Sequence, residues 1–250
     1  MKKLELKKRF FESKPGKKVM TWLKLFRQGL RPAKVGFVLK NKKMKPTDNV
    51  GFLIFSIPAV YTCPFATEQC LKYCYAKSAY MYKSVCVNHV GNWIASLKDD
   101  FIEQACNAIR DTIYTKKGTV RKAFQRPDGS IKKIYVRVHE SGDFYSLEYL
   151  LKWLEIAKQF PDLQFFAYTK SVPYFYGLEL PKNFVVRFSI FPDTPIEHVN
   201  WIMKNRKPFY TAVNEFSADC EYKCDCADGC GACGCQCGTS KKAIETILKK

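Results

Sequence analysis

The sequence lacks an apolar run long enough to cross a membrane, although 47% of its 250 residues are hydrophobic. A transmembrane helix needs about 20 consecutive apolar residues, so the chain does not read as a membrane protein. Five of its first nine residues are basic, and no apolar stretch follows them. A secretory signal is therefore not expected. We predict a cytoplasmic protein whose thiols stay reduced.

Acidic residues are scarce: the chain has 23 Asp and Glu residues against 42 Lys and Arg residues, a net charge of +19. This excess predicts a negatively charged partner, with nucleic acid or an anionic substrate favoured over an anionic membrane. Residues 1–48 carry 16 basic and 3 acidic residues, a net charge of +13, with aromatic residues between them. We interpret them as a basic N-terminal arm. It either contacts nucleic acid or packs its aromatic side chains on the main domain.

No internal repeat is present, and from residue 50 onward strand patterns alternate with helix patterns. This alternation indicates a parallel sheet. Because the strand count falls short of the eight of a full barrel, we predict an α/β fold with a partial (β/α) barrel over residues 49–215. The predicted strands are 50–60, 134–139, 163–169, 184–190 and 208–213, and the predicted helices are 99–114, one capped by Ser146, 195–205, and a closing helix with Ile244, Ile247 and Leu248 on one face.

Three cysteines, Cys63, Cys70 and Cys74, follow the first predicted strand in the pattern C-x6-C-x3-C. Structural zinc normally takes four ligands, whereas three thiolates on a four-iron cluster leave one iron open to a small molecule. The carboxyl end of a barrel strand is also where such folds keep their sites. We predict that these cysteines bind a 4Fe–4S cluster. The alternative is a chance group of buried thiols.

Polar residues follow the second predicted strand, in the order His139, Glu140, Ser141, Gly142 and Asp143. We predict His139, Glu140 and Asp143 as catalytic residues, and the segment from Glu140 to Asp143 as cofactor-binding. Alternatively, Asp143 meets the free amides at the N-terminus of the next helix. The two roles are compatible.

The next two strands add further polar residues. Lys170 is a catalytic candidate because a lysine at a strand end suits a phosphate or a carboxylate. Arg187 lies in an apolar run, where an arginine is seldom buried without a partner. Polar ends on successive strands indicate one site over the barrel mouth. The further cofactor-binding candidates are Tyr168, Ser171, Arg187 and Ser189.

Residues 216–250 form a predicted tail with seven cysteines within 18 residues, interleaved with glycines that allow tight turns. Such density requires a metal or a cluster to organise it. Zinc would take four of the thiols; a second 4Fe–4S cluster, which we favour, would also take four. The candidate ligands are Cys220, Cys224, Cys226, Cys230, Cys233, Cys235 and Cys237.

The loop with the first three cysteines resembles that of the radical S-adenosylmethionine superfamily. The usual pattern there is C-x3-C-x-Φ-C, in which Φ is aromatic, and Tyr73 takes this place before Cys74. The spacing here is wider by three residues in the first gap and by one in the second. The resemblance implies an open iron that binds S-adenosylmethionine, with the segment from His139 to Asp143 placed like the one that holds its methionyl amine. It also implies an auxiliary cluster in the tail.

A closer resemblance is to a phage family known as gene product 88. It rests on TCP-x-A-T-x2-C-x3-CYA (residues 62–76), RVH-x-SGDFYS (residues 137–146), YTKS (residues 168–171) and the cysteine-rich tail. It implies an architecture and cluster ligands, in a phage- or bacterium-encoded protein, rather than a reaction.

Together these features predict a radical-S-adenosylmethionine-like iron–sulfur enzyme that does one-electron chemistry on a nucleic acid or a nucleotide. A reading from another class stays open. In it the protein is a non-catalytic zinc protein that binds nucleic acid through its arm and its cysteine modules.

Overall fold

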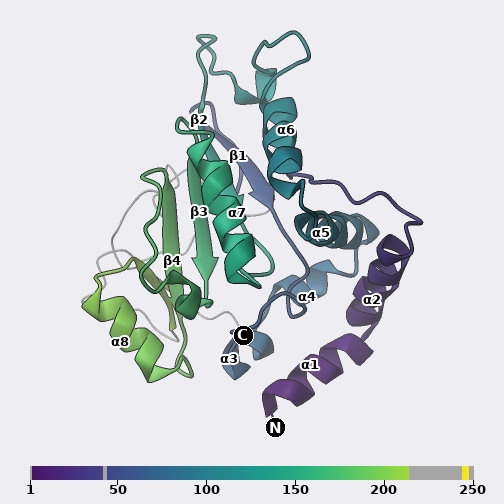
Figure 1. Ribbon diagram of the computed structural model, residues 1–250, viewed down its shortest axis with the longest axis vertical. Coiled ribbons are helices and arrows are strands. Elements are labelled where there is room, and N and C mark those ends of the chain that lie inside the picture. Colours follow the sequence, from purple (N-terminus) through teal and green to yellow (C-terminus); the bar gives the residue numbers. More distant parts are fainter. Residues whose placement is uncertain (1, 42–43, 214–243, 248–250) are drawn as a thin grey trace.

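The computed structural model describes residues 2–41, 44–213 and 244–247, which form an α/β fold around one parallel sheet (Figure 1). Strands adjacent in the chain are adjacent in the sheet, and every pair is parallel. This sequential order is that of a (β/α) barrel with fewer strands, so the predicted fold class is confirmed. The strands are β1 (Val50–Phe55), β2 (Lys133–Val138), β3 (Gln164–Thr169), β4 (Phe184–Ile190), β5 (Phe209–Val213) and β6 (Ile244–Ile247).

Helices form the N-terminal region, and further helices connect the strands to one another. Ser146 caps the helix after β2, as predicted, because its hydroxyl accepts a hydrogen bond from the amide of Tyr149 at 3.2 Å. The helices are α1 (Lys2–Glu12), α2 (Lys14–Arg27), α3 (Glu68–Lys72), α4 (Ala76–Ala79), α5 (Lys83–Ser96), α6 (Phe101–Ile113), α7 (Leu147–Lys158) and α8 (Ile196–Lys204), with short 3-10 turns η1 (Lys122–Phe124) and η2 (Val172–Phe175). None of the described helices is both long and apolar enough to span a bilayer.

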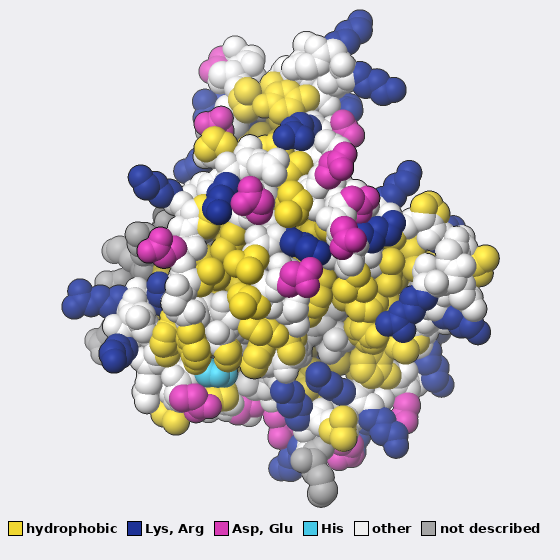
Figure 2. All heavy atoms as spheres, viewed as in Figure 1, with side chains coloured by type: hydrophobic (Ala, Val, Ile, Leu, Met, Phe, Trp, Pro, Cys, Tyr) yellow, Lys and Arg dark blue, Asp and Glu magenta, His cyan; other side chains and the backbone are white. Residues whose placement is uncertain are grey.

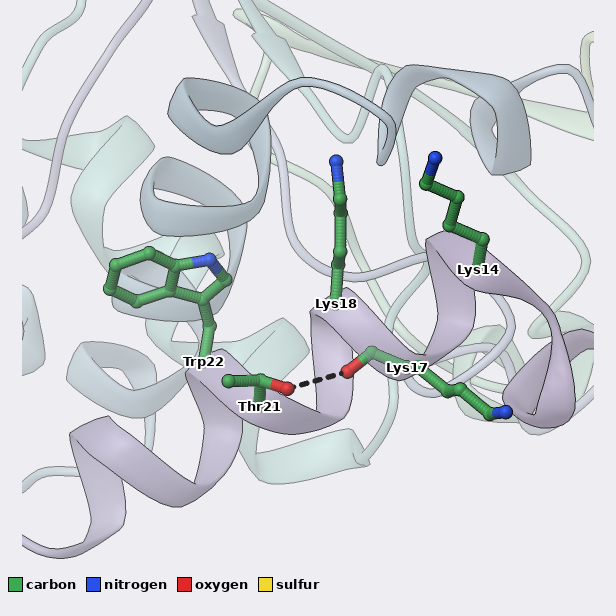
Figure 3. Close-up of a pocket in the computed structure, with 5 residues that line it drawn as sticks. All are labelled: Lys14, Lys17, Lys18, Thr21 and Trp22. Atoms are coloured by element: carbon green, nitrogen blue, oxygen red, sulfur yellow. Dashed lines mark hydrogen bonds between the residues drawn. The ribbon is translucent and has the colours of Figure 1, made fainter.

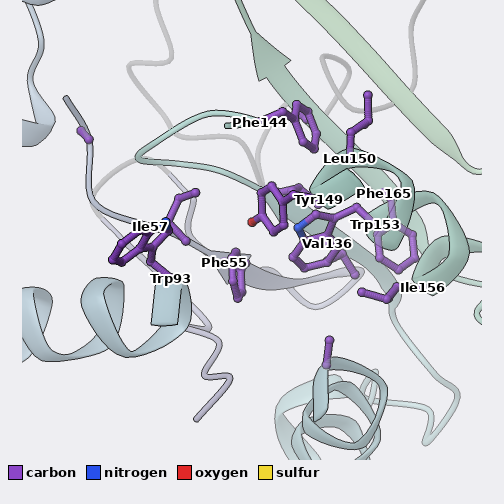
Figure 4. Packing of buried hydrophobic residues seen from close by; sticks show 14 of the residues in the cluster. Phe55, Ile57, Trp93, Val136, Phe144, Tyr149, Leu150, Trp153, Ile156 and Phe165 are labelled. Carbon is purple, nitrogen blue, oxygen red and sulfur yellow. The ribbon is translucent and has the colours of Figure 1, made fainter. Parts of the chain in front are cut away.

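The larger core lies between one face of the sheet and helices α5, α6 and α7 (Figure 4). Phe55 of β1 meets Trp153 of α7 with the ring centroids 4.9 Å apart, and Phe101 of α6 packs against both rings. All three side chains are fully buried. Burial of side chains of this size contributes about 1.5–3 kcal/mol each to folding.

A smaller core covers the other face of the sheet. It contains Phe52, Tyr135 and Phe166 from three neighbouring strands, together with Met44. The guanidinium of Arg137 lies over the ring of Phe166, 5.7 Å from its centroid. Because alternate residues of a strand face opposite sides, β1 needs apolar residues throughout, which explains its unbroken sequence VGFLIF.

The N-terminal helices pack against the main domain. Phe10 of α1 and Val19, Leu23 and Phe26 of α2 are buried in the larger core. The ammonium of Lys3 donates a hydrogen bond to the carbonyl of Pro64, in the cysteine loop, at 3.3 Å. Of the two roles expected for the arm, packing of its aromatic residues is therefore seen in the structure. Contact with nucleic acid stays a prediction.

The sequence patterns are wrong for the last element, extend the first strand beyond its end at Phe55, and do not predict helices α1, α2 and α5. The closing helix is wrong, because Ile244–Ile247 form strand β6, which pairs with the edge of β5. A four-residue stretch carries too little periodicity to separate helix from strand. Helix α5 is not predicted at all, because the polar side chains of His89 and Asn92 are buried in it beside Val90 and Trp93. Such a helix has no polar face for a pattern to reveal.

Candidate functional site

The candidate site lies at the carboxyl ends of the strands. The arrows of β1 and β3 point toward the part of the molecule that contains α3, α4 and α1 (Figure 1). The chain leaves β1 into the loop and the short helices that carry Cys63, Cys70 and Cys74. The ends of β2, β3 and β4 meet at the same edge, because all these strands are parallel and in register.

Two polar side chains set the position of the cysteine loop. The hydroxyl of Thr67 caps α3 by accepting a hydrogen bond from the amide of Cys70 at 3.2 Å. The carboxylate of Asp193, which follows β4, accepts a hydrogen bond from the amide of Gln69 at 2.7 Å. The segment after β4 is thereby tied to the helix that carries the second cysteine.

The three thiols lie half-buried and act on one another electrostatically. Burial raises the pKa of Cys63 well above its ordinary value, and Asp143 and the other two thiols raise it further. Burial also raises the pKa of Cys70 to about 11, against the opposing effect of Lys170. The thiols are thus protonated at neutral pH, and a bound metal would have to displace their protons by its own charge.

Asp143 joins the ends of β2 and β3. Its Oδ1 accepts hydrogen bonds from the hydroxyl of Thr169 at 2.6 Å and the amide of Phe144 at 2.7 Å, and its Oδ2 accepts one from the amide of Lys170 at 2.9 Å. Burial raises the pKa of Asp143 to about 6, although these hydrogen bonds oppose the rise. Neither oxygen bonds an amide of α7, which Ser146 caps instead.

Lys170 is a buried cation close to the cysteines. Its side chain is buried, its ammonium donates a hydrogen bond to the carbonyl of Ser189 at 3.0 Å, and it lies 3.6 Å from the ring centroid of Phe191. Burial lowers the pKa of Lys170 to about 8, while Cys70 and Asp143 oppose the decrease. The predicted catalytic lysine thus lies within the electrostatic reach of the predicted metal ligands.

His139, at the end of β2, is fully buried and has a left-handed backbone with φ of 65°. Its Nε2 lies 2.8 Å from the hydroxyl of Tyr149, and its Nδ1 has no hydrogen-bond partner among the described residues. Burial, with a contribution from Arg137, lowers the pKa of His139 to about 3, so the ring is neutral. A buried, strained residue with an unpaired nitrogen is a feature that functional sites often retain.

Ser141 and Gly142 hold the segment after β2 against the loop after β1. The hydroxyl of Ser141 donates to the carbonyl of Ile57 at 3.1 Å and lies 2.8 Å from the hydroxyl of Tyr80. Gly142 has φ of +86°, and a Cβ there would stand 2.3 Å from Cγ1 of Ile57. Both residues therefore have structural contacts at the positions where we predicted cofactor binding. Glu140 is half-buried, and its carbonyl accepts a hydrogen bond from the hydroxyl of Tyr75.

The other cofactor-binding candidates divide between two locations. Ser171 is fully buried next to Lys170, and its hydroxyl donates to the carbonyl of Phe144 at 2.7 Å. Tyr168 pairs in register with Arg187, so both lie on the sheet face that carries the smaller core. Ser189 lies two residues further along β4 and presents its carbonyl to Lys170.

The remaining cysteines of the described residues are structural. Cys86 is buried and its thiol donates to the carbonyl of Tyr80 at 3.2 Å, while Cys106 lies on the buried face of α6. The predicted ligands from Cys220 to Cys237 lie outside the described residues. Within the described residues, no three His, Cys, Asp or Glu side chains stand close enough together to hold a single metal ion.

Asp193 is the site residue that the sequence reasoning missed. It contributes to the electrostatic surroundings of both Cys70 and Lys170, in addition to its bond to α3. The signal was present, because Asp193 follows the end of β4 as Asp143 follows the end of β2. The rule of polar strand ends, applied to one more strand, finds it.

A family model described as Gene product 88 matches residues 27–244. The chain belongs to the Gene product 88 family. Its relatives include the Gene 88 protein of Mycobacterium phage L5, which is 31% identical over 139 residues, covering 53% of this chain and 54% of the relative. The Gene 88 protein of Mycobacterium phage D29 is 30% identical over 139 residues, covering 53% of each.

The chain spans about half the length of the curated relatives that it matches. No solved structure matches the chain. Family membership confirms the closer of the two resemblances drawn from the sequence. The wider one, to the radical S-adenosylmethionine superfamily, stays a prediction.

Proposed function

We propose that this Gene product 88 family member is an iron–sulfur protein whose Cys63, Cys70 and Cys74 hold a 4Fe–4S cluster at the carboxyl edge of the sheet. The observation that carries the proposal is the gathering of these three thiols at that edge, within electrostatic reach of Asp143 and Lys170. Edges of this kind are where parallel (β/α) folds keep their sites.

The number of thiols supports a cluster over a zinc ion at this position. Structural zinc takes four ligands on one centre, and within the described residues no group of even three such side chains could hold one ion. Three thiolates on a four-iron cluster leave one iron open to a small molecule. We therefore propose a four-iron cluster with three protein ligands.

Charged residues at this edge can stabilise an anionic cluster and bind a small ligand. Lys170 supplies a positive charge that offsets the negative charge of thiolates. Glu140 offers a carboxylate that is only half-buried, whereas the carboxylate of Asp143 is fully used in joining β2 to β3. Such a cluster, when bound, supplies electrons singly and an iron with an exchangeable position. We propose S-adenosylmethionine as the small ligand and one-electron chemistry on a nucleic acid or a nucleotide as the activity.

Metal analysis after oxygen-free purification tests this function. We expect brown protein with iron and sulfide in excess of zinc. Replacing Cys63, Cys70 and Cys74 together by Ala should remove one cluster's iron. The matched control replaces Cys86 and Cys106 by Ala, since these thiols are structural, and should keep the full iron content.

Two results would contradict the proposal. Colourless protein with stoichiometric zinc would support the non-catalytic zinc reading instead. Equal iron content in the triple variant and the control would show that the three cysteines are not ligands. The tail cysteines are tested separately. The seven cysteines between positions 220 and 237 are replaced by Ala, and the iron that remains bound is measured.

A further inference from the structure

The outer face of α2 carries a basic pocket. Lys14, Lys17, Lys18, Thr21 and Trp22 line a shallow pocket of about 510 Å³ (Figure 3). These positions recur every three or four residues, so they share one side of the helix. Figure 3 shows Lys14 and Lys18 extending side by side from α2. The residues buried in the core, including Val19 and Leu23, occupy the opposite side.

Two further cations close around the pocket. The guanidinium of Arg31 lies 5.3 Å from the ring centroid of Trp22, and the ammonium of Lys83 lies 5.7 Å from it. Trp22 thus contacts one cation from the segment after α2 and one from the start of α5. The ammonium of Lys18 donates a hydrogen bond to the carbonyl of Met81 at 2.6 Å, which holds the pocket against the segment before α5.

No acidic partner neutralises this group within the described residues. The ion pairs there involve Lys8, Arg9, Lys152 and Lys158, none of which lines the pocket. Five positive charges therefore surround a surface depression without a carboxylate. Figure 2 shows further Lys and Arg side chains in the part of the face where Figure 1 places α1 and α2. These cations repel one another, and a multivalent anion bound among them would offset the repulsion.

We propose that this pocket binds the phosphates of a nucleic acid strand. Lys14, Lys17 and Lys18 would contact successive phosphates along the helix, and Trp22 would keep Arg31 and Lys83 directed at the same strand. Tyr82, next to Lys83, is 68% exposed and offers an aromatic face on which a base can stack. The contacts read the backbone rather than the sequence of the strand.

The structure favours nucleic acid over an anionic membrane. A helix that lies on a membrane inserts its apolar face into the lipid and keeps its basic face outside. In α2 the apolar face is already buried in the core through Val19, Leu23 and Phe26. Only the lysine face is left for a partner. A basic face without apolar residues is sufficient to contact a phosphate backbone.

The pocket is separate from the proposed cluster. Its lining residues all belong to α2, and none of them comes from the cysteine loop or the strand ends. Binding to the pocket needs no cluster, so it can hold even if the proposed iron–sulfur function fails.

The test measures the fluorescence anisotropy of a labelled single-stranded oligonucleotide with the full chain, at several potassium chloride concentrations. The test variant carries Lys14→Gln, Lys17→Gln and Lys18→Gln. The control carries Lys116→Gln, Lys117→Gln and Lys122→Gln, exposed lysines far along the chain that remove the same charge. A double variant, Lys14→Gln with Lys17→Gln, keeps the structural hydrogen bond of Lys18.

We expect the triple variant to weaken binding at least about ten-fold and to reduce the salt slope by about 1 to 2, because each phosphate contact to a single strand contributes about 0.7. The double variant should show most of this loss, and the control should change affinity less than about two-fold. Equal weakening by the triple variant and the control would overturn the proposal, as would no binding by the unchanged protein. Binding to phosphatidylserine–phosphatidylcholine vesicles, without binding to the oligonucleotide, would also overturn it.

Discussion

The carboxylate of Asp143 accepts a hydrogen bond from the backbone amide of Lys170 at 2.9 Å, and this bond joins the end of β2 to the end of β3. The two residues were predicted separately as catalytic groups. Their contact shows that one of them positions the other, because Asp143 fixes the start of the segment that directs the side chain of Lys170. Glu140, which is half-buried, and Asp193, which is exposed, are then the carboxylates of this edge that have room for a ligand.

Replacing Asp143 by Ala should lower the free energy of unfolding by about 3 kcal/mol or more. The change leaves the hydroxyl of Thr169 and the amides of Phe144 and Lys170 buried without an acceptor, at about 1–3 kcal/mol each before relaxation. Equilibrium unfolding in urea measures the loss. Glu140→Ala serves as the control and should change stability by less than about 0.5 kcal/mol. Equal effects of the two variants would show that the network around Asp143 is not a structural link.

Gly142→Ala should destabilise the protein far more than Gly118→Ala. Both glycines have positive φ, at +86° and +76°, so both substitutions carry the backbone cost of about 1–2 kcal/mol. A Cβ at Gly142 also meets Ile57 and Thr62, whereas nothing lies within 4 Å of a Cβ at Gly118. Thermal unfolding of the two variants compares them directly. Similar midpoints would contradict the close approach of the two loops.

Stability should decrease as the pH falls below about 6.5, because His89 and His139 are buried in neutral form. Burial lowers the pKa of each to about 3 from the ordinary value of about 6.5. The unfolded chain therefore binds protons more readily, so this stability is present above the unfolded pKa and is lost on acidification. Each histidine accounts for about 2 kcal/mol between about pH 7 and about pH 5.

His89→Gln should reduce the loss of unfolding free energy between about pH 7 and about pH 5 by about 2 kcal/mol, the contribution of one histidine. Urea unfolding at both pH values measures it, and His89 is chosen because it lies in α5 and is not one of the predicted site residues. A variant with the same pH dependence as the unchanged protein would show that His89 is not held neutral in the folded state.

Lys170→Met should lower the reduction potential of the cluster that we propose. Removing a buried positive charge near the cysteines disfavours the added electron, because net charge is one of the determinants of cluster potentials. A spectroscopic redox titration of anaerobically purified protein measures the potential. Lys158→Met, on the exposed side of α7, is the control and should leave it unchanged. An unchanged reduction potential in the Lys170 variant would show that this lysine does not lie near the cluster.

S-adenosylmethionine should perturb the electron paramagnetic resonance spectrum of the reduced protein if it binds the open iron. Glu140→Gln should weaken the effect, since this carboxylate is half-buried at the strand ends and available to an ammonium group. Glu155→Gln, which changes an exposed carboxylate of α7 in the same way, serves as the matched control. A spectrum indifferent to the compound would leave an iron–sulfur protein with another ligand.

Strand patterns were the most predictable feature of the fold. Four strands, β2 to β5, lie within a residue of their predicted bounds, because apolar runs in a parallel sheet are long and bounded by turn residues. The same reasoning missed α5, where His89 and Asn92 are satisfied by tertiary contacts. Asn92 donates to the carbonyls of Gly36 and Ser56, 56 and 36 residues away in the chain.

The sequence by itself determined the class of fold, the position of the cysteine loop after β1 and the polar character of the strand ends, because these follow from local spacing and periodicity. Only the tertiary structure decided which polar groups are free. Asp143 and Lys170 are 27 residues apart and Asp193 and Gln69 are 124 apart, yet each pair shares a hydrogen bond. Whether a buried carboxylate binds a ligand or holds the backbone depends on such distant partners, because a buried polar group takes whichever hydrogen bonds the packed chain brings to it.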